Sequence, residues 1–210
     1  MVWRKRYLLL PFLLFSFTYK ATAQTPDTTT LKVRNGRLPN VVIQTKDGRK
    51  EQGYMVYHFP YSPDKEVKLF PLTGNTKEGV TYEVKYLESL EYPDLRYVQI
   101  FPDNDRQEYF AREAATGALN LYTFTELNKA PAVIPVAGVV RAISIPYDQS
   151  LFFIEKDSEI KKINRGNYQK ELLAYVGSNA ALAEKIKNKT YKYKDIETII
   201  KEYNASVLKP

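Results

Sequence analysis

The best hairpin signal in the chain is the stretch Val41-Val42-Ile43-Gln44-Thr45-Lys46-Asp47-Gly48-Arg49-Lys50-Glu51-Gln52-Gly53-Tyr54. The β-branched run at its start favours a strand. The Asp-Gly pair that follows tolerates the positive φ angles of a tight hairpin turn. Residues 52–59 then predict the returning strand, with the glycine at a β-bulge. The mature fold is therefore expected to begin with an antiparallel pair of strands.

Short strands separated by turn residues are predicted along the next hundred residues. Strict alternation places Tyr82, Val84 and Tyr86 on one face of a strand. Turn chemistry occurs at 103–105, at 115–117 and around Pro146-Tyr147-Asp148. This spacing predicts an antiparallel sheet, a sandwich or an open barrel. The expected strands cover residues 66–71, 81–92, 97–101, 108–112, 119–125, 139–145 and 151–155.

The hydrophobic period changes near Asp157, from two residues to that of a helix. Helices are predicted at 168–176, 179–188 and 195–205 from apolar residues three and four apart. Short helices rarely persist alone in water, so these are expected to pack on one face of the sheet. The expected fold class is α+β: a mainly antiparallel β body with a short C-terminal helical segment packed on it. It is predicted to form a single domain over 40–204, with its helices within 166–204, after a flexible lead-in at 24–39.

The N-terminus has the order of a secretory signal peptide. Arg4-Lys5-Arg6 precedes an uncharged, mostly apolar run at 7–17 and then Ala21-Thr22-Ala23. A positive region, a short apolar run and an A-x-A site are typical of export with cleavage, here between Ala23 and Gln24. Residues 1–23 are thus predicted to be removed. The protein is expected to be exported, and to be periplasmic, associated with the outer membrane, or secreted.

Charge and composition limit the classes of function. The 210-residue chain has a net charge of +7, but loss of the signal leaves 27 of its 31 basic residues against 24 acidic ones, a net charge of +3. The basic pI of 9.3 therefore does not indicate a nucleic-acid partner. With no cysteine and one histidine, neither a thiolate nor a multi-histidine metal site can form in one chain. No cofactor is expected.

Four short motifs resemble an uncharacterised family of exported proteins from Bacteroidota bacteria. They are Asp47-Gly48 before Gly53-Tyr54, Gly117 before Leu121-Tyr122, Phe152-Phe153-Ile154-Glu155-Lys156 and Ile199-Ile200-Lys201-Glu202-Tyr203-Asn204. The similarity extends from about Val41 to Asn204, with residues 131–147 as an insertion. The resemblance implies export and a β-rich fold. The family has no established activity, so the resemblance implies no functional residue.

Three groups of residues have side chains that could form a chemical site. Asp103-Asn104-Asp105 with Glu108 could supply oxygen ligands to calcium, but the loop lacks the glycine and ligand number of a calcium loop, which favours a solvated turn. His58 has no second ligand or partner nearby, which favours a structural role. Glu83, Glu88 and Glu91 could include a catalytic pair, although a polar strand face is the simpler interpretation. No catalytic residue is therefore predicted.

A lysine–tyrosine segment near the C-terminus is the one candidate binding site in the sequence. Residues 158–210 carry a net charge of +5, and after export the available polyanions would be lipid head groups and acidic glycans. The interpretation that the sequence favours is that these lysines solvate a loop and complement helix C-termini, and binding of such a polyanion is the alternative. Alternate spacing at 185, 187 and 189 does not place lysines on one helical face. The residues predicted to contact an anionic partner are Lys185, Lys187, Lys189, Tyr191, Lys192, Tyr193 and Lys194.

Residues 130–140 form an uncharged stretch with two prolines, Pro131 and Pro135, which prevent a regular helix. The stretch is predicted to be a partly buried connection or an edge strand, with contact to a membrane or a partner as the alternative. Taken together, the sequence predicts an exported, non-enzymatic protein that binds an envelope protein or glycan or supports the cell envelope. Membrane contact is expected at the surface only. The alternative function is a hydrolase acting on envelope glycans through Asp and Glu carboxylates.

Overall fold

A computed structural model describes residues 37–56, 61–72, 78–92, 95–136 and 139–208, with backbone only for 37–39 and 132–143. The predicted signal peptide, its cleavage site and His58 lie outside these residues. The strands are β1 (Arg37–Thr45), β2 (Lys50–Val56), β3 (Glu66–Phe70), β4 (Val80–Glu83), β5 (Leu87–Tyr92), β6 (Leu95–Ile100), β7 (Tyr109–Ala115), β8 (Asn120–Val136), β9 (Val139–Lys156) and β10 (Glu159–Ile163). The helices are α1 (Tyr168–Val176), α2 (Ala180–Lys187) and α3 (Ile196–Val207).

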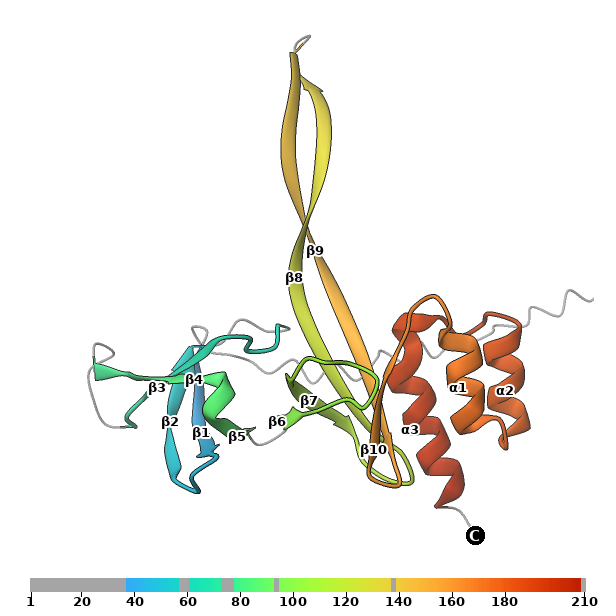
Figure 1. Cartoon of the computed structure of the whole chain (residues 1–210), viewed down its shortest axis with the longest axis horizontal. Coiled ribbons are helices and arrows are strands. Elements are labelled where there is room, and N and C mark those ends of the chain that lie inside the picture. Colours follow the sequence, from blue (N-terminus) through green and yellow to red (C-terminus); the bar gives the residue numbers. More distant parts are fainter. Residues whose placement is uncertain (1–36, 57–60, 73–77, 93–94, 137–138, 209–210) are drawn as a thin grey trace, which may run out of the picture. The chain divides into compact units, whose positions relative to one another are not determined.

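All ten described strands belong to one sheet in the order β10-β9-β8-β7-β6-β5-β1-β2-β3-β4 (Figure 1). Every pairing between the described strands is antiparallel. The predicted α+β class, with an antiparallel body and a helical C-terminal segment, is confirmed. Of the three β architectures left open by the sequence, the structure has the sheet.

The β1–β2 hairpin forms as the sequence predicts. Gly48 has a φ of 86° in the turn, and its N–H donates to the Thr45 carbonyl at 2.8 Å. The Asp47 carboxylate accepts from the Arg49 guanidinium at 2.8 Å. The expected bulge at Gly53 is wrong, because the register shift falls in β1, between Leu38 and Val41. Glycine is required at 53 because a Cβ there would lie 2.2 Å from the Phe70 carbonyl oxygen.

Two strand predictions need correction. Residues 81–92 do not form one strand: a 3-10 turn at Val84–Tyr86 separates β4 from β5. The turn lets Val84 bury its side chain while Tyr86 stays exposed. The predicted turn around Pro146 is also wrong, because it lies inside the 18-residue strand β9. β9 pairs with the 17-residue strand β8, so the described residues of the uncharged stretch, 130–136 and 139–140, belong to these two long strands.

The three helices pack on one face of the sheet, over β7, β8, β9 and β10. Leu121 of β8 and Ile154 of β9 are directly opposite one another and fully buried in this cluster. The helices contribute Leu172, Val176, Leu182, Ile186, Ile196, Ile199 and Ile200. The other face has its own cluster, in which Tyr109 packs on Phe153 with ring centroids 4.7 Å apart. These strands are therefore buried on both faces, which fixes the position of the hairpin base.

A buried asparagine joins the helical segment to the β7–β8 turn. Asn204 of α3 accepts from the Leu119 N–H at 3.0 Å and donates to the Leu119 carbonyl at 2.8 Å and the Thr116 carbonyl at 3.2 Å. Gly117 lies against this side chain, and a Cβ at 117 would come within 2.7 Å of the Asn204 Cγ. The turn and the last helix therefore fit one another closely.

Candidate binding site at the base of the β8–β9 hairpin

A pocket of about 500 Å³ lies where β10 ends beside β9, and we call it the basic pocket. Its walls come from β9, from the end of β10 and from the loop between α2 and α3. The residues that line it are Asp148, Gln149, Ser150, Leu151, Phe152, Lys162, Ile163, Asn164, Arg165, Lys192, Tyr193 and Lys194. The pocket thus brings together side chains that are far apart in the sequence.

Three cations of this pocket lack an acidic partner. Among the residues that the structure describes, Arg165, Lys192 and Lys194 form no ion pair. Asp148 also lines the pocket, and its carboxylate accepts from the Tyr61 hydroxyl at 2.9 Å. The three cations without an ion-pair partner among the described residues outnumber this one carboxylate, so positive charge is in excess in the pocket.

Aromatic packing holds the floor of the pocket in place. Tyr193 contacts Phe152 edge-on, with ring centroids 5.1 Å apart, and its hydroxyl donates to the Ile163 carbonyl. Burial raises the pKa of Tyr193, so this hydroxyl remains a neutral donor. The Arg165 guanidinium lies 5.9 Å from the centroid of the same ring. Tyr193 thus positions both the loop and one of the cations.

The structure divides the predicted lysine–tyrosine segment. Lys192, Tyr193 and Lys194 line the basic pocket, whereas the Lys185 ammonium contacts Glu202 of α3 at 3.1 Å. Its hydrogen bond to Glu202 raises the pKa of Lys185, and the Tyr191 hydroxyl also donates to Glu202. Lys187 and Lys189 are exposed at and after the end of α2. Two of the five lysines therefore share a pocket. Sequence reasoning missed Arg165, which precedes α1 with no local signal of its own.

The polar turn at 103–105 has a structural role. The Asn104 side chain accepts from the Lys162 N–H at 2.8 Å and donates to its carbonyl at 3.0 Å. Asp103 makes the matching pair of bonds with the Ile160 backbone. These two residues act as a short strand along the outer edge of β10, and we call them the β10 cover. No group of His, Asp or Glu suited to a metal occurs among the described residues.

Acid is expected to weaken the attachment of this turn to β10. A hydrogen bond from the Lys162 ammonium, at 2.7 Å, lowers the pKa of Asp105 from 3.8 to about 2. A lowered folded-state pKa adds stability that is complete above pH 3.8 and is lost as the pH falls through 2. Asp105→Asn should therefore cost about 1–2 kcal/mol at pH 7, and the difference from wild type should shrink between pH 4 and pH 2. Urea unfolding at several pH values measures this, and a pH-independent difference would contradict it.

The glutamates weighed as a catalytic pair are separate and exposed. Glu83 contacts Lys85 at 2.5 Å, Glu88 accepts from Gln44 at 2.7 Å and Glu91 contacts Arg96 at 3.3 Å. They lie on β4 and β5 and form surface pairs, in agreement with the polar strand face. No described helix is long and apolar enough to cross a membrane.

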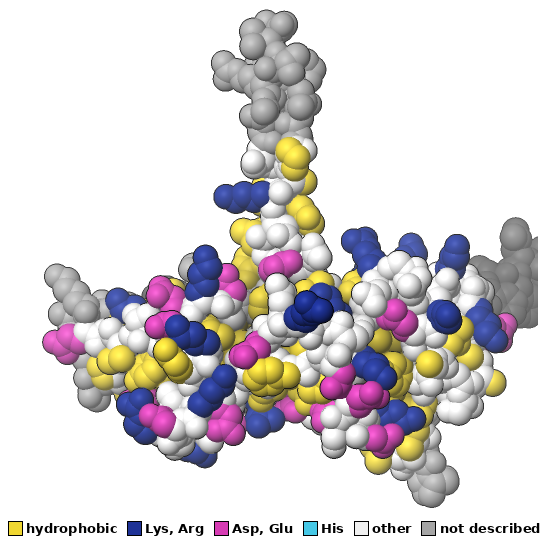
Figure 2. Space-filling view, viewed as in Figure 1, with side chains coloured by type: hydrophobic (Ala, Val, Ile, Leu, Met, Phe, Trp, Pro, Cys, Tyr) yellow, Lys and Arg dark blue, Asp and Glu magenta, His cyan; other side chains and the backbone are white. Residues whose placement is uncertain are grey.

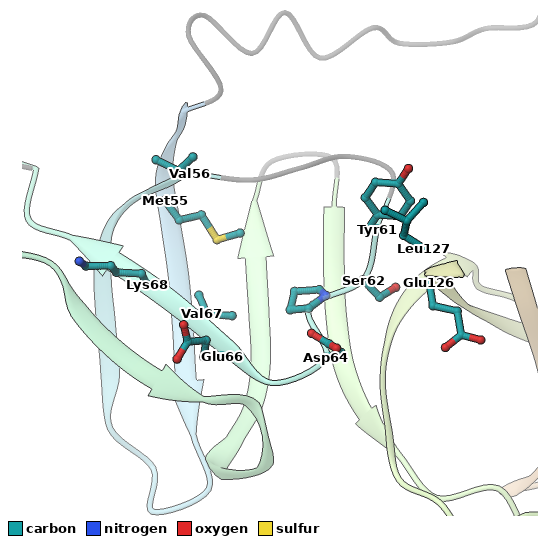
Figure 3. Close-up of a pocket in the computed structure, with 11 residues that line it drawn as sticks. Met55, Val56, Tyr61, Ser62, Asp64, Glu66, Val67, Lys68, Glu126 and Leu127 are labelled. Carbon is teal, nitrogen blue, oxygen red and sulfur yellow. The ribbon is translucent and has the colours of Figure 1, made fainter. Parts of the chain in front are cut away.

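A second pocket, of about 410 Å³, lies on the β8 side of the hairpin base (Figure 3). Met55 and Val67 contribute apolar surface, and Asp64, Glu66 and Glu126 contribute carboxylates. Figure 3 shows Asp64 and Glu66 on the segment that leads into and begins β3, and Glu126 on β8.

Comparison of the chain with protein-family models, with curated proteins and with solved structures gave no match in any of the three. Fold and site therefore define a class: an α+β protein whose ten-stranded antiparallel sheet includes a long hairpin with a basic pocket at its base.

Proposed function

We propose that the chain is an exported, non-enzymatic protein of the cell envelope that binds an acidic partner in the basic pocket. The observation that carries the proposal is the group of three cations, Arg165, Lys192 and Lys194, which line one pocket without an ion-pair partner among the described residues. Unpaired charges that converge on a concave site attract groups of opposite sign. Export rests on the order of charged, apolar and small residues at 1–23.

The binding part of the proposal is tested with a polyglutamate peptide and with heparin as a sulfated glycan. The variant Arg165→Gln/Lys192→Gln/Lys194→Gln should weaken binding by about threefold to a hundredfold at low salt, since each lost contact of this kind is worth about 0.2–1 kcal/mol. The matched control is Lys170→Gln/Lys187→Gln/Lys189→Gln, which removes the same charge from exposed positions outside the pocket. Calorimetry at two salt concentrations measures both variants. Equal loss in both would show that net charge, and not the pocket, attracts the ligand.

The export part is tested by N-terminal sequencing of the protein from its native cell. A start at Gln24 is expected. A start at Met1 or Val2 in envelope material would contradict cleavage.

The second candidate function is a hydrolase of envelope glycans, and the carboxylates of the pocket in Figure 3 favour it. Hydrolysis of a glycosidic bond needs an acid and a base or nucleophile on opposite sides of the bond. Glu126→Gln should then abolish release of reducing sugar from envelope glycans. Absence of any release by the wild-type protein would remove this candidate.

A further inference from the structure

The outer part of the β8–β9 hairpin is a two-stranded ribbon. We define it as the hairpin arm, the rungs from Glu126↔Gln149 to Val136↔Val139. β7 pairs with β8 only as far as Thr123, and β10 pairs with β9 only as far as Phe152. In the described structure the arm thus has no neighbouring strand on either side (Figure 1). Figure 2 shows hydrophobic side chains exposed along its described part, and Leu127, Ile145 and Tyr147 are each about half exposed.

Contacts at the base show which backbone groups of the arm face outward. Thr125 of β8 exchanges hydrogen bonds with Ser62, at 2.7 Å and 3.0 Å, on the side away from β9. The backbone N–H groups of Ile160 and Lys162 in β10 bond to the β10 cover. The backbone groups of Lys161 and Ile163 therefore point toward β9, where their partners are Ile154 and Phe152. Along an antiparallel strand, the N–H and C=O groups of successive residues point alternately toward the partner strand and away from it. The β8–β9 register has no shift. The backbone groups that point away from the partner strand therefore belong to odd-numbered residues of β8 and even-numbered residues of β9.

The three prolines of the arm fit this pattern and make its two edges unequal. Pro131 and Pro135 are odd residues of β8, and Pro146 is an even residue of β9, so each lies where its missing N–H costs no bond within the hairpin. On the β8 edge, Pro131 and Pro135 remove two outward donors, and on the β9 edge Pro146 removes one. Nearer the tip of the arm, Val140, Ala142 and Ser144 keep their outward N–H and carbonyl groups. The β8 edge is therefore blocked against strand pairing, whereas the β9 edge is open from Val140 to Ser144.

At the β8 edge and the β10 edge, other parts of the chain form hydrogen bonds with the outward backbone groups. Ser62 satisfies Thr125 at the β8 edge, and the β10 cover satisfies Ile160 and Lys162 at the β10 edge. An open strand edge invites pairing, and natural proteins usually protect such edges. An isolated two-stranded hairpin is also only marginally stable in water. The open β9 edge is therefore suited to receive a strand.

We propose that the β9 edge from Val140 to Ser144 binds an extended acidic polypeptide segment as an added strand, and that this segment continues past Pro146 and places its acidic side chains in the basic pocket. Asp148 and Ser150 are even-numbered residues of β9 and also line the basic pocket. One extended chain can therefore reach both the β9 edge and the pocket. Main-chain bonds supply affinity in this mode, and side-chain pockets supply selectivity. The inference rests on the proposed function and names the partner class for the same pocket.

Charge favours an acidic segment over a second copy of this chain. Two β9 edges that paired antiparallel about Ala142 would place the two Arg141 residues as diagonal neighbours, where like charges repel. Neither copy would then bring an acid from this edge to the cations Arg165, Lys192 and Lys194. Insertion of the arm into lipid is disfavoured because the outward groups of Val140 to Ser144 would lie unpaired in hydrocarbon.

The test uses the mature chain and a synthetic peptide of about ten residues that alternates threonine with valine and has a glutamate-rich end. Ala142→Pro removes an outward donor from the β9 edge. Its matched control is Val133→Pro, which changes the residue on the same rung at the blocked edge. Both substitutions spare the bonds within the hairpin. Ala142→Pro should weaken peptide binding about tenfold or more, Val133→Pro should change it less than about twofold, and N-methylation of alternate peptide amides should abolish it.

Hydrogen exchange gives a second measurement. In the free protein the amides of Val140, Ala142 and Ser144 should exchange faster than those of Arg141 and Ile143, and the peptide should protect the first three. If the pocket triple variant abolishes binding while Ala142→Pro and N-methylation have no effect, the acidic site stands and the added strand is overturned. Loss of binding in none of these variants overturns both. A concentration-dependent dimer that Ala142→Pro disrupts, or binding to anionic vesicles without binding of the peptide, also overturns the proposal.

Discussion

Replacement of Asn204 by alanine is expected to lower the free energy of unfolding by about 3–5 kcal/mol. The side chain makes three hydrogen bonds to the backbone of the β7–β8 turn, and it is 5% exposed. Removal leaves the Leu119 N–H and carbonyl without partners in a buried place, and each unsatisfied buried group costs about 1–3 kcal/mol. Urea unfolding of the variant measures the loss.

Two further variants test whether the contacts of Asn204 with the β7–β8 turn cause this loss of stability. Asn167→Ala changes an exposed asparagine whose side chain does not cap its helix, and should alter stability by less than about 0.5 kcal/mol. Gly117→Ala should destabilise the wild type because of its contact with Asn204, and should cost less when Asn204 is already alanine. A double-mutant cycle measures this coupling. Additive effects would show that the turn and the helix do not constrain one another as the structure indicates.

Local signals explain why much of the fold could be predicted from the sequence. The Asp47-Gly48 turn has its own hydrogen bonds and positive φ, so the first hairpin is encoded within a few residues. The helices at 168–176, 180–187 and 196–207 closely match the predicted 168–176, 179–188 and 195–205, because each has an apolar stripe. The Asn179 side chain accepts from the Leu182 N–H at 3.1 Å and so begins α2.

Strands that depend on distant partners could not be predicted in this way. β10 was missed because Glu159-Ile160-Lys161-Lys162-Ile163 has no clear alternation, and its edge is satisfied by residues 103–104, more than fifty positions earlier. β9 was divided at Pro146 because proline there indicates a turn locally. Its position in the register requires no N–H toward β8, which is a property of the pairing and not of the local sequence.

Only part of the candidate site could be predicted, because the rest of it also depends on residues that are distant in the sequence. Lys192 and Lys194 belong to a lysine-rich run that is visible in the sequence, and they line the basic pocket. Lys185 belongs to the same run, yet it pairs with Glu202 of α3, whose proximity depends on how α2 and α3 pack. Arg165 joins the pocket because β10 ends beside β9. A charge run therefore located the region, whereas tertiary packing selected the members of the site.

Leu172→Ala is expected to lower the free energy of unfolding by about 2–5 kcal/mol, the usual range for a fully buried leucine. Leu172 of α1 is 0% exposed in the cluster between the helices and the sheet. Leu208→Ala is the matched control, because Leu208 is 76% exposed, and it should change stability by less than about 0.5 kcal/mol.

The same variant tests whether helices and sheet unfold as one unit. Short helices need the sheet face to persist, and the sheet needs the helices to cover Leu121 and Ile154. Unfolding followed by far-ultraviolet circular dichroism and by tyrosine fluorescence should therefore give coincident transitions in the wild type, and coincident transitions at lower urea in Leu172→Ala. A helical signal lost before the tyrosine signal in either protein would show that the helical segment is a separate unit. The packed interface would then not be what stabilises the base of the hairpin.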